Sequence, residues 1–287
     1  MANDLHTTAR RLGRLVEPLA AAIYFSPEAQ ERYDAFGLNY VEGYFCSRSA
    51  SLGKAPWRLV TAVFGAFKPE VVERAVEGGW AKTDPDAMLD ARLAGARDQA
   101  RRLIGEQPVA DLLRAAELLL DATDGVDPSG RALFSGLLGL EVPGEDDPYG
   151  RLWRAADRVR EHRGDGHIAA WVPHVDSTEI TLLSELWWGM TPGSYVWTRG
   201  YDADDVAAAR GRLAARHLIS GDGEDAALTP EGLQLRQDIE VATDLAAREP
   251  IRRLGDRVDE LLVLLEPWSA AMVGKGGYPA SASEMFA

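Results

Sequence analysis

Apolar residues recur at helical spacing through the first half of the chain, and cap signals divide the pattern into separate helices. Ser26-Pro27-Glu28 and Thr83-Asp84-Pro85 each supply an N-cap followed by a first-turn proline, and Asp147-Pro148 repeats the signal. We therefore expect residues 1–165 to form an all-helical domain. The helices predicted in it are 5–23, one that starts at 27, 33–52, 56–67, 83–104, 108–120 and 148–160.

The pattern changes in the second half, where two helices precede a hairpin signal. Pro192-Gly193 breaks the pattern between the two helices, and Gly221 to Asp225 has the composition of a hairpin turn. Helix, turn, helix, two-stranded wing and helix follow one another as in a winged helix. We therefore expect a mainly α fold in which 166–287 is a winged-helix domain with a small wing and a C-terminal helix. Its predicted elements are helices 177–188 and 202–216, strands 217–220 and 226–228, and helix 229–248.

Several runs in this second half resemble the recognition helix, wing and following helix of MarR-type regulators. These runs are Asp204–Arg210, Leu213–Ile219, Leu228–Gly232 and Leu235-Arg236. Together with Tyr44-Phe45, Ser47-Arg48 and Glu161–His167, they are also similar to an actinobacterial helix-turn-helix family. In MarR-type proteins the terminal helices build the dimer, so the resemblance implies a homodimer formed through the apolar segment 254–265, which Glu266-Pro267 is expected to end.

The charge of the predicted winged helix does not match a DNA-binding surface. The chain carries a formal charge of -14, and residues 170–250 contain 14 acidic residues against 6 arginines. Acidic residues open the predicted recognition helix and occupy the wing, and no Lys or Arg lies between Arg216 and Arg236. Because duplex DNA is held largely through its phosphates, we expect DNA to be repelled. The same charge argues against anionic membranes.

Composition narrows the chemistry further. Cys46 is the only cysteine, so a disulfide within the chain is excluded, and so is a metal site built from several cysteines. The sequence contains no phosphate-binding glycine loop, dinucleotide fingerprint, Gly-x-Ser-x-Gly elbow or His-Glu-x-x-His helix, so no cofactor is expected. With no secretory signal or membrane span in the pattern, we expect a cytoplasmic protein. Abundant alanine and few lysines are typical of actinobacterial genomes.

One candidate site is a polar stripe on a predicted helix. Tyr40, Tyr44 and Arg48 are spaced four residues apart and share a helical face. Tyrosine hydroxyls can bind or move protons, Arg48 can hold an anionic group, and Glu42 can act as a base if burial raises its pKa. The alternative is that the tyrosines belong to the core and that Arg48 pairs with an acid.

A second candidate is the polar segment His162-Arg163-Gly164-Asp165-Gly166-His167. It can line a pocket at the domain junction, where ligand sites often form. Its short spacings rarely complete a metal site, so none is expected. The alternative is that Gly164 ends one helix, Asp165 caps the next one, and the histidines are surface groups.

Four tryptophans, Trp171, Trp187, Trp188 and Trp197, crowd the start of the second domain. They can form the wall of an aromatic ligand pocket or belong to the core. We therefore expect a protein that binds a small organic molecule between its two domains. The hypothesis extends to a cofactor-free acid/base enzyme of actinobacterial biosynthesis that performs cyclisation, elimination or hydrolysis. Its catalytic residues would be Glu42, Arg48, Asp165 and His167, and its ligand-binding residues Tyr40, Tyr44, His162, Arg163, Trp171, Trp187 and Trp188. The alternatives are a ligand-responsive MarR-like regulator and a noncatalytic binding or partner protein.

Overall fold

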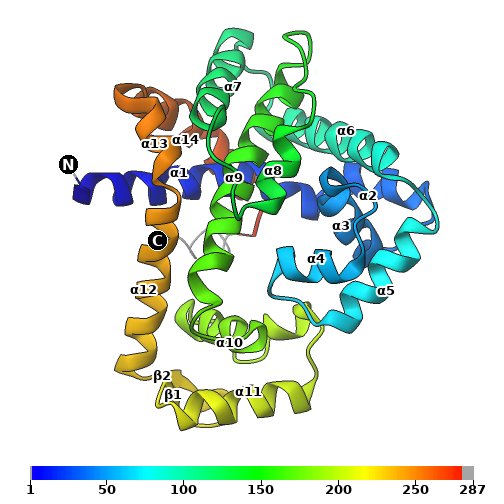
Figure 1. The fold of residues 1–287 in the computed structure, drawn as a ribbon. Coiled ribbons are helices and arrows are strands. Elements are labelled where there is room, and N and C mark those ends of the chain that lie inside the picture. Colours follow the sequence, from blue (N-terminus) through cyan, green and yellow to red (C-terminus); the bar gives the residue numbers. More distant parts are fainter. Residues whose placement is uncertain (1, 280–287) are drawn as a thin grey trace.

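The computed structural model describes residues 2–279 (Figure 1). Its first part is helical, as predicted. The helices are α1 (Ala2–Ala21), α2 (Pro27–Asp34), α3 (Tyr40–Ser49), α4 (Trp57–Phe64), α5 (Pro69–Trp80), α6 (Pro85–Ile104), α7 (Val109–Thr123), α8 (Ala132–Leu138) and α9 (Pro148–Trp171), with 3-10 turns at Ala22–Phe25 and Ala50–Leu52. The side chains of Ser26, Asp84 and Asp147 accept backbone N–H bonds at the starts of α2, α6 and α9, so the predicted cap signals work as expected.

The second part is a winged helix, which confirms the predicted fold class. Its elements are α10 (Ser177–Trp187), the 3-10 helix η3 (Val196–Arg199), α11 (Ala203–Ala215), strands β1 (Ile219–Ser220) and β2 (Ala227–Leu228), a 3-10 turn at Gly223–Asp225, and α12 (Pro230–Ala246). The two strands pair antiparallel, with Ile219 opposite Leu228. Buried residues of α10, α11 and α12, including Leu183, Leu213 and Ile239, form a separate small core beneath the wing.

The chain then returns to the helical part through α13 (Arg248–Leu254), a 3-10 turn at Gly255–Arg257 and α14 (Val258–Gly274). The apolar face of α14, with Leu261, Leu265 and Trp268, is buried against α1, α6 and α7 of the same chain. The face that the sequence assigns to a dimer interface therefore packs internally. The predicted end at Glu266-Pro267 is wrong, because the helix continues through Pro267 to Gly274.

The long helix α9 is the centre of the molecule (Figure 1). It packs against α1, α6, α7 and α8 on the helical side and runs beside α12 of the winged helix. The helix end predicted at Arg160 is wrong, and so is the alternative in which Gly164 ends one helix and Asp165 caps the next, because α9 continues through these residues to Trp171. A Cβ on Gly166 would lie 2.9 Å from Arg131 Nη1 and 3.0 Å from Ala246 Cβ, so this glycine permits close packing rather than a turn.

A second correction concerns the single helix predicted for 33–52. The chain turns between α2 and α3, where Gly37 adopts a φ of +73° and Asn39 caps α3 in a reciprocal capping box with Glu42. Three further helices, α5, α8 and α13, were not predicted from the pattern. The predicted domain boundary at 165/166 falls inside α9, which crosses it without interruption. The division into two domains stays a prediction.

Candidate ligand cavity at the junction

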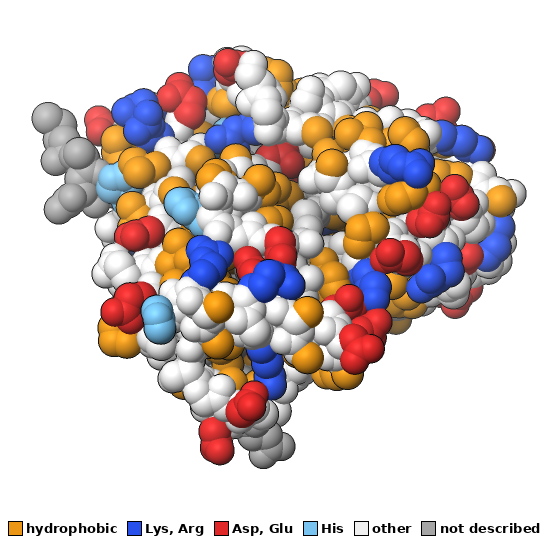
Figure 2. All heavy atoms as spheres, turned by 60° about the horizontal axis from the view of Figure 1, so that its bottom comes forward, with side chains coloured by type: hydrophobic (Ala, Val, Ile, Leu, Met, Phe, Trp, Pro, Cys, Tyr) orange, Lys and Arg blue, Asp and Glu red, His pale blue; other side chains and the backbone are white. Residues whose placement is uncertain are grey.

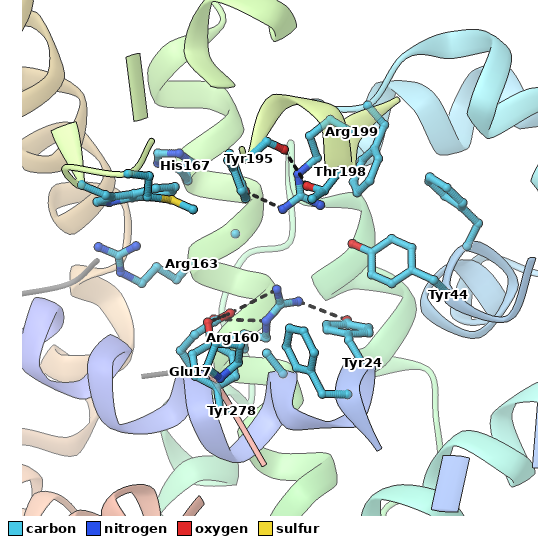
Figure 3. A pocket seen from close by; sticks show the side chains of 18 of the residues that line it. Glu17, Tyr24, Tyr44, Arg160, Arg163, His167, Tyr195, Thr198, Arg199 and Tyr278 are labelled. Carbon is cyan, nitrogen blue, oxygen red and sulfur yellow. Dashed lines mark hydrogen bonds and ion pairs between the residues drawn. The ribbon is translucent and has the colours of Figure 1, made fainter. Parts of the chain in front are cut away.

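A cavity of about 740 Å³ lies between the helical part and the winged helix (Figure 3). Side chains from α1, α3, α9, α12 and the η3 region converge on it. Its wall is mainly apolar and aromatic, and its described charged residues are four arginines and two glutamates. The charged set is Glu17, Arg160, Arg163, Arg199, Arg236 and Glu240.

Three of the four arginines are held by carboxylates. Arg160 contacts Glu17 at 3.1 Å and Glu161 at 2.6 Å, and it donates to the Tyr24 hydroxyl at 3.3 Å (Figure 3). Arg163 donates to Asp244 at 2.8 Å. Their charges are therefore largely balanced within the protein.

Arg236 is the third paired arginine and one of the most deeply buried side chains of the protein. It donates to Glu240 at 2.7 Å and lies 4.3 Å from the Trp187 ring centroid. Burial raises the pKa of Glu240, but the effect of Arg236 and other nearby cations is larger and lowers that pKa to about 2. Glu240 is consequently an anion throughout the physiological pH range.

Arg199 differs from the other three. Its Nη2 donates to the Tyr195 hydroxyl at 2.5 Å, and its guanidinium lies 4.4 Å from the Tyr195 ring centroid and 4.6 Å from that of Phe67. Its buried Nε has no hydrogen-bond acceptor in the part of the chain that the structure describes. Within residues 2–279, no carboxylate lies within ion-pair distance of it. Arg199 therefore brings an unbalanced positive charge to the cavity wall.

His167 lies on the wall between α9 and α12. Its Nδ1 lies 3.0 Å from Thr243 Oγ1 and 4.0 Å from Glu240 Oε1. Burial lowers the pKa of His167 to about 4, so the imidazole is neutral at pH 7. At that pH it can exchange hydrogen bonds with a bound molecule but is a weak proton acceptor.

Aromatic side chains line the opposite side and the opening. The Tyr24 and Tyr44 rings pack at 4.9 Å between centroids. The wall residues Phe25, Tyr40 and Trp197 are each about half exposed, at 50%, 53% and 52%. These rings therefore give the cavity flat apolar surfaces that also reach solvent.

Five of the eleven residues predicted for the site line the cavity: Tyr40, Tyr44, Arg163, His167 and Trp188. They come from three separate stretches of sequence, which the fold brings together at the junction. The roles given to them in binding or catalysis stay predictions.

Four predicted polar residues lie outside the cavity wall: Glu42, Arg48, His162 and Asp165. Glu42 faces α5, where its atoms lie beside Gly78 and Gly79, and it contacts Lys82 Nζ at 2.6 Å. Burial raises the pKa of Glu42, but hydrogen bonds from Lys82 and Asn39 outweigh it and lower that pKa, which is the opposite of what a base near neutrality needs. Arg48 is engaged by Glu161 through two bonds of 2.9 Å, as the alternative interpretation of this arginine expected.

The other predicted residues outside the wall make contacts within the protein interior. Asp165 accepts from the Phe134 N–H at 3.0 Å, and burial raises its pKa to about 6. His162 packs edge-on to the Phe134 ring, and burial lowers its pKa to about 3. Trp171 belongs to the small core, and Trp187 lies beneath Arg236.

Several wall residues were not predicted from the sequence: Glu17, Tyr24, Arg160, Tyr195, Arg199, Arg236, Glu240 and Tyr278. One signal was available, since Tyr195 and Arg199 are four residues apart directly before the Asp202 cap of α11. The pairing of Arg160 with Glu17 joins positions that are 143 residues apart, and no local pattern shows it.

The outer face of the winged helix has the opposite character. The exposed positions of α11 include Asp204, Ala207, Ala208 and Gly211, and Arg212 is paired with Asp176 at 2.6 Å. Figure 2 shows acidic and basic side chains mixed over the face it displays, without a continuous basic ridge among the residues it draws in colour. Among the described residues, no three metal-ligating side chains lie together as a metal site would need. In the same part of the chain, no helix is long and apolar enough to span a bilayer.

The two-stranded wing and the helix pair ahead of it define a winged-helix protein, and its junction with the helical part holds a mainly apolar cavity with four arginines in its wall. A family model described as a helix-turn-helix family matches residues 9–279, and the chain belongs to this family. No curated protein and no solved structure matches the chain. The family match covers both the helical part and the winged helix.

Proposed function

We propose that this helix-turn-helix protein binds a small organic molecule in the junction cavity. The observation that carries the proposal is the cavity itself. Its volume of about 740 Å³ falls inside the roughly 300–1,000 Å³ of small-molecule sites. Its wall combines apolar and aromatic surface with a few converging polar groups, which is the usual composition of such sites.

The wall favours binding over acid/base catalysis. A catalytic acid or base works best with a pKa near the operating pH. Among the wall groups, the pKa of His167 is lowered to about 4, that of Glu240 is lowered to about 2, and burial raises that of Tyr24 to about 12. Asp165 has a pKa near neutrality but lies outside the wall. The enzyme hypothesis therefore lacks a well-tuned proton carrier at the cavity.

A ligand-responsive regulator is the second candidate. It is favoured by the helix-turn-helix family and by the chain path, because only three positions separate Arg199 on the cavity wall from Asp202, the N-cap of α11. The MarR-like resemblance and a homodimer belong to this candidate. The face of α11 opposes it, because alanines and Asp204 occupy exposed positions and the exposed Arg212 and Arg216 are paired with Asp176 and Glu179. Little positive charge is left for the phosphate contacts of a DNA reader.

Uptake of a neutral apolar dye tests the proposed cavity. Gly164 lines the cavity within α9, and a Cβ placed there would meet only Glu161 Oε2, at 3.4 Å. The larger side chain of Gly164→Leu would extend into the cavity, whereas Gly164→Ala leaves most of it open. We expect N-phenyl-naphthylamine to bind wild type and Gly164→Ala with one-to-one stoichiometry by fluorescence titration, and to bind Gly164→Leu at least about tenfold more weakly.

Equal dye binding by Gly164→Leu and wild type, with both variants folded by circular dichroism, would exclude the cavity as the site. The regulator candidate has a separate test on random duplex DNA. Submicromolar affinity that falls steeply with salt would favour a DNA reader over a binding protein. The charge of the outer face predicts no such binding at physiological ionic strength.

A further inference from the structure

The four cavity arginines divide by the charge that faces them. Arg160, Arg163 and Arg236 each contact one or more carboxylates within 3.1 Å. The positive potential they direct into the cavity is therefore reduced by adjacent negative charge. Arg199 contacts aromatic rings and a neutral hydroxyl instead.

The position of Arg199 is fixed by both parts of the protein. Phe67, which precedes α5, and Tyr195, at the start of η3, provide the rings on which the guanidinium packs. Its backbone carbonyl accepts from Lys68 N–H at 2.9 Å. A guanidinium held in this way loses little conformational entropy when an anion binds to its N–H groups.

Figure 3 shows Arg199 and Glu17 on opposite sides of the cavity, with Tyr44 to one side. A negatively charged group is thus favoured near Arg199 and disfavoured near Glu17. Between these poles, the aromatic surface of Tyr24 and Tyr44 suits an apolar body. The electrostatics of the cavity are therefore directional.

From this geometry we infer that the ligand is an amphipathic organic monoanion, with a carboxylate, sulfonate or similar oxyanion bound by Arg199 and an apolar, ring-containing body against the tyrosines. The inference rests on the proposed function and specifies its ligand class. One unbalanced arginine matches one negative charge. The surrounding chain has a formal charge of -14, so the attraction for an anion is local to the cavity.

Two dyes with the same ring system and different charge test the inference. Anilinonaphthalene sulfonate carries one sulfonate, and N-phenyl-naphthylamine is its neutral counterpart. We expect wild type to bind the sulfonate at least about tenfold more tightly, because charge-assisted hydrogen bonds to Arg199 are available to it alone. Tighter or equal binding of the neutral dye would overturn the inference, and this comparison needs no variant.

The variant Arg199→Gln then tests whether Arg199 causes the preference for the sulfonate dye. We expect the affinity for the sulfonate to fall about 10–100-fold while the affinity for the neutral dye changes less than about threefold. Arg252→Gln is the matched control, because it removes one positive charge from a half-exposed position on α13, outside the cavity. Arg199→Lys, which keeps the charge, should recover part of the lost affinity.

The possible failures are distinguishable. If Gly164→Leu leaves the binding of both dyes unchanged, the cavity is not the site, and the proposed function fails. If Gly164→Leu weakens both dyes but Arg199→Gln retains the full preference for the sulfonate, the cavity stands and the inference about Arg199 is wrong.

Discussion

Two regions along α9 use arginine in opposite ways. On the helical side, Arg48 and Arg160 enclose Glu161, and Arg160 also contacts Glu17, so each buried charge has an opposite charge beside it. Across the cavity, Arg199 of η3 packs between two rings and faces no carboxylate among residues 2–279. In the first region the positive and negative charges balance one another, while in the second the positive charge of Arg199 has no opposite charge beside it.

The difference separates arginines whose charge is balanced inside the protein from the one that the proposed ligand would contact. Buried ion pairs are expensive to break because the remaining partner keeps its desolvation cost. An arginine stacked on aromatic rings is held by weaker contacts and can be replaced with a smaller loss of stability. Stability and binding should therefore respond to different arginines.

The largest expected effect on stability comes from removing Glu161, the carboxylate that Arg48 and Arg160 share. Glu161→Leu leaves Arg48 buried with only the Tyr44 hydroxyl as a polar side-chain partner and should lower the free energy of unfolding by about 3–5 kcal/mol. The double variant Glu161→Leu/Arg48→Met removes both charges and should recover part of that loss. Urea denaturation measures both. In the same assay, Arg199→Met should lower the free energy of unfolding by only about 1 kcal/mol. A loss as large as that of Glu161→Leu would mean that Arg199 stabilises the fold.

Asp165 extends the comparison to a buried carboxylate that has no ion pair within the described residues. Burial raises its pKa to about 6, so between pH 4 and pH 6 the native state binds a proton that the unfolded state has released. Stability due to this group is full below the unfolded pKa and is lost as the pH rises through about 6.

Asp165→Asn keeps an acceptor for the Phe134 N–H and removes this titration. Relative to wild type, it should gain about 2–3 kcal/mol of unfolding free energy between pH 4 and pH 6. The difference between the two proteins is the useful measurement, because His162 and His167, whose lowered pKa values make the unfolded state the stronger proton binder, give the opposite slope in both. A constant difference across this pH range would contradict the assignment.

A smaller effect on stability is expected from glycine substitutions on the cavity side and on the packed side of α9. Gly164 faces the cavity, and its Cβ position is nearly clear, so Gly164→Ala should stabilise the helix by about 1 kcal/mol. Gly166→Ala should be destabilising instead, since its Cβ would meet Arg131 and Ala246. Thermal unfolding of the two variants should shift in opposite directions, and equal shifts would mean that the two sides are alike.

The smallest expected effect is the pH dependence of binding. The pKa of His167 is about 4, that of Glu240 is about 2 and that of Tyr24 is about 12, so none of these wall groups changes charge between pH 5.5 and pH 9. The affinity for anilinonaphthalene sulfonate should vary less than about twofold over this range. A clear titration near pH 6 would indicate that a group such as Asp165 is coupled to the cavity.

The winged helix could be predicted from the sequence because its signals are local. Thr229-Pro230 caps α12, Asp202 caps α11, and the glycines at 221 and 223 form the turn of the wing. The break between α2 and α3 was missed, although it also depends on a local glycine, because the aromatic pattern runs across Gly37. α8 was missed because seven residues are too few for a clear period.

The sequence predicted where the cavity lies but only some of the residues that line it. A junction site with Tyr44 and His167 followed from the pattern, whereas the face that Glu42 presents depends on Lys82, which is 40 positions away. The partner of Arg48 is 113 positions away. Arg199 lies in a short 3-10 helix with no periodicity, so its isolation from carboxylates appears only in three dimensions.

The contact of Lys68 with the winged helix bears on how the proposed ligand would reach the cavity. Its N–H bonds to the Arg199 carbonyl at 2.9 Å, and its ammonium group contacts Asp202 at 2.7 Å and Asp205 at 2.5 Å. Separating the two parts at this edge would break all three bonds together, so the half-exposed rings of Phe25, Tyr40 and Trp197 provide the easier path. Exposed side chains change rotamer within picoseconds to nanoseconds. Entry and exit should consequently be fast, with exchange set by encounter in solution and by residence on the tyrosines rather than by a slow opening of the fold.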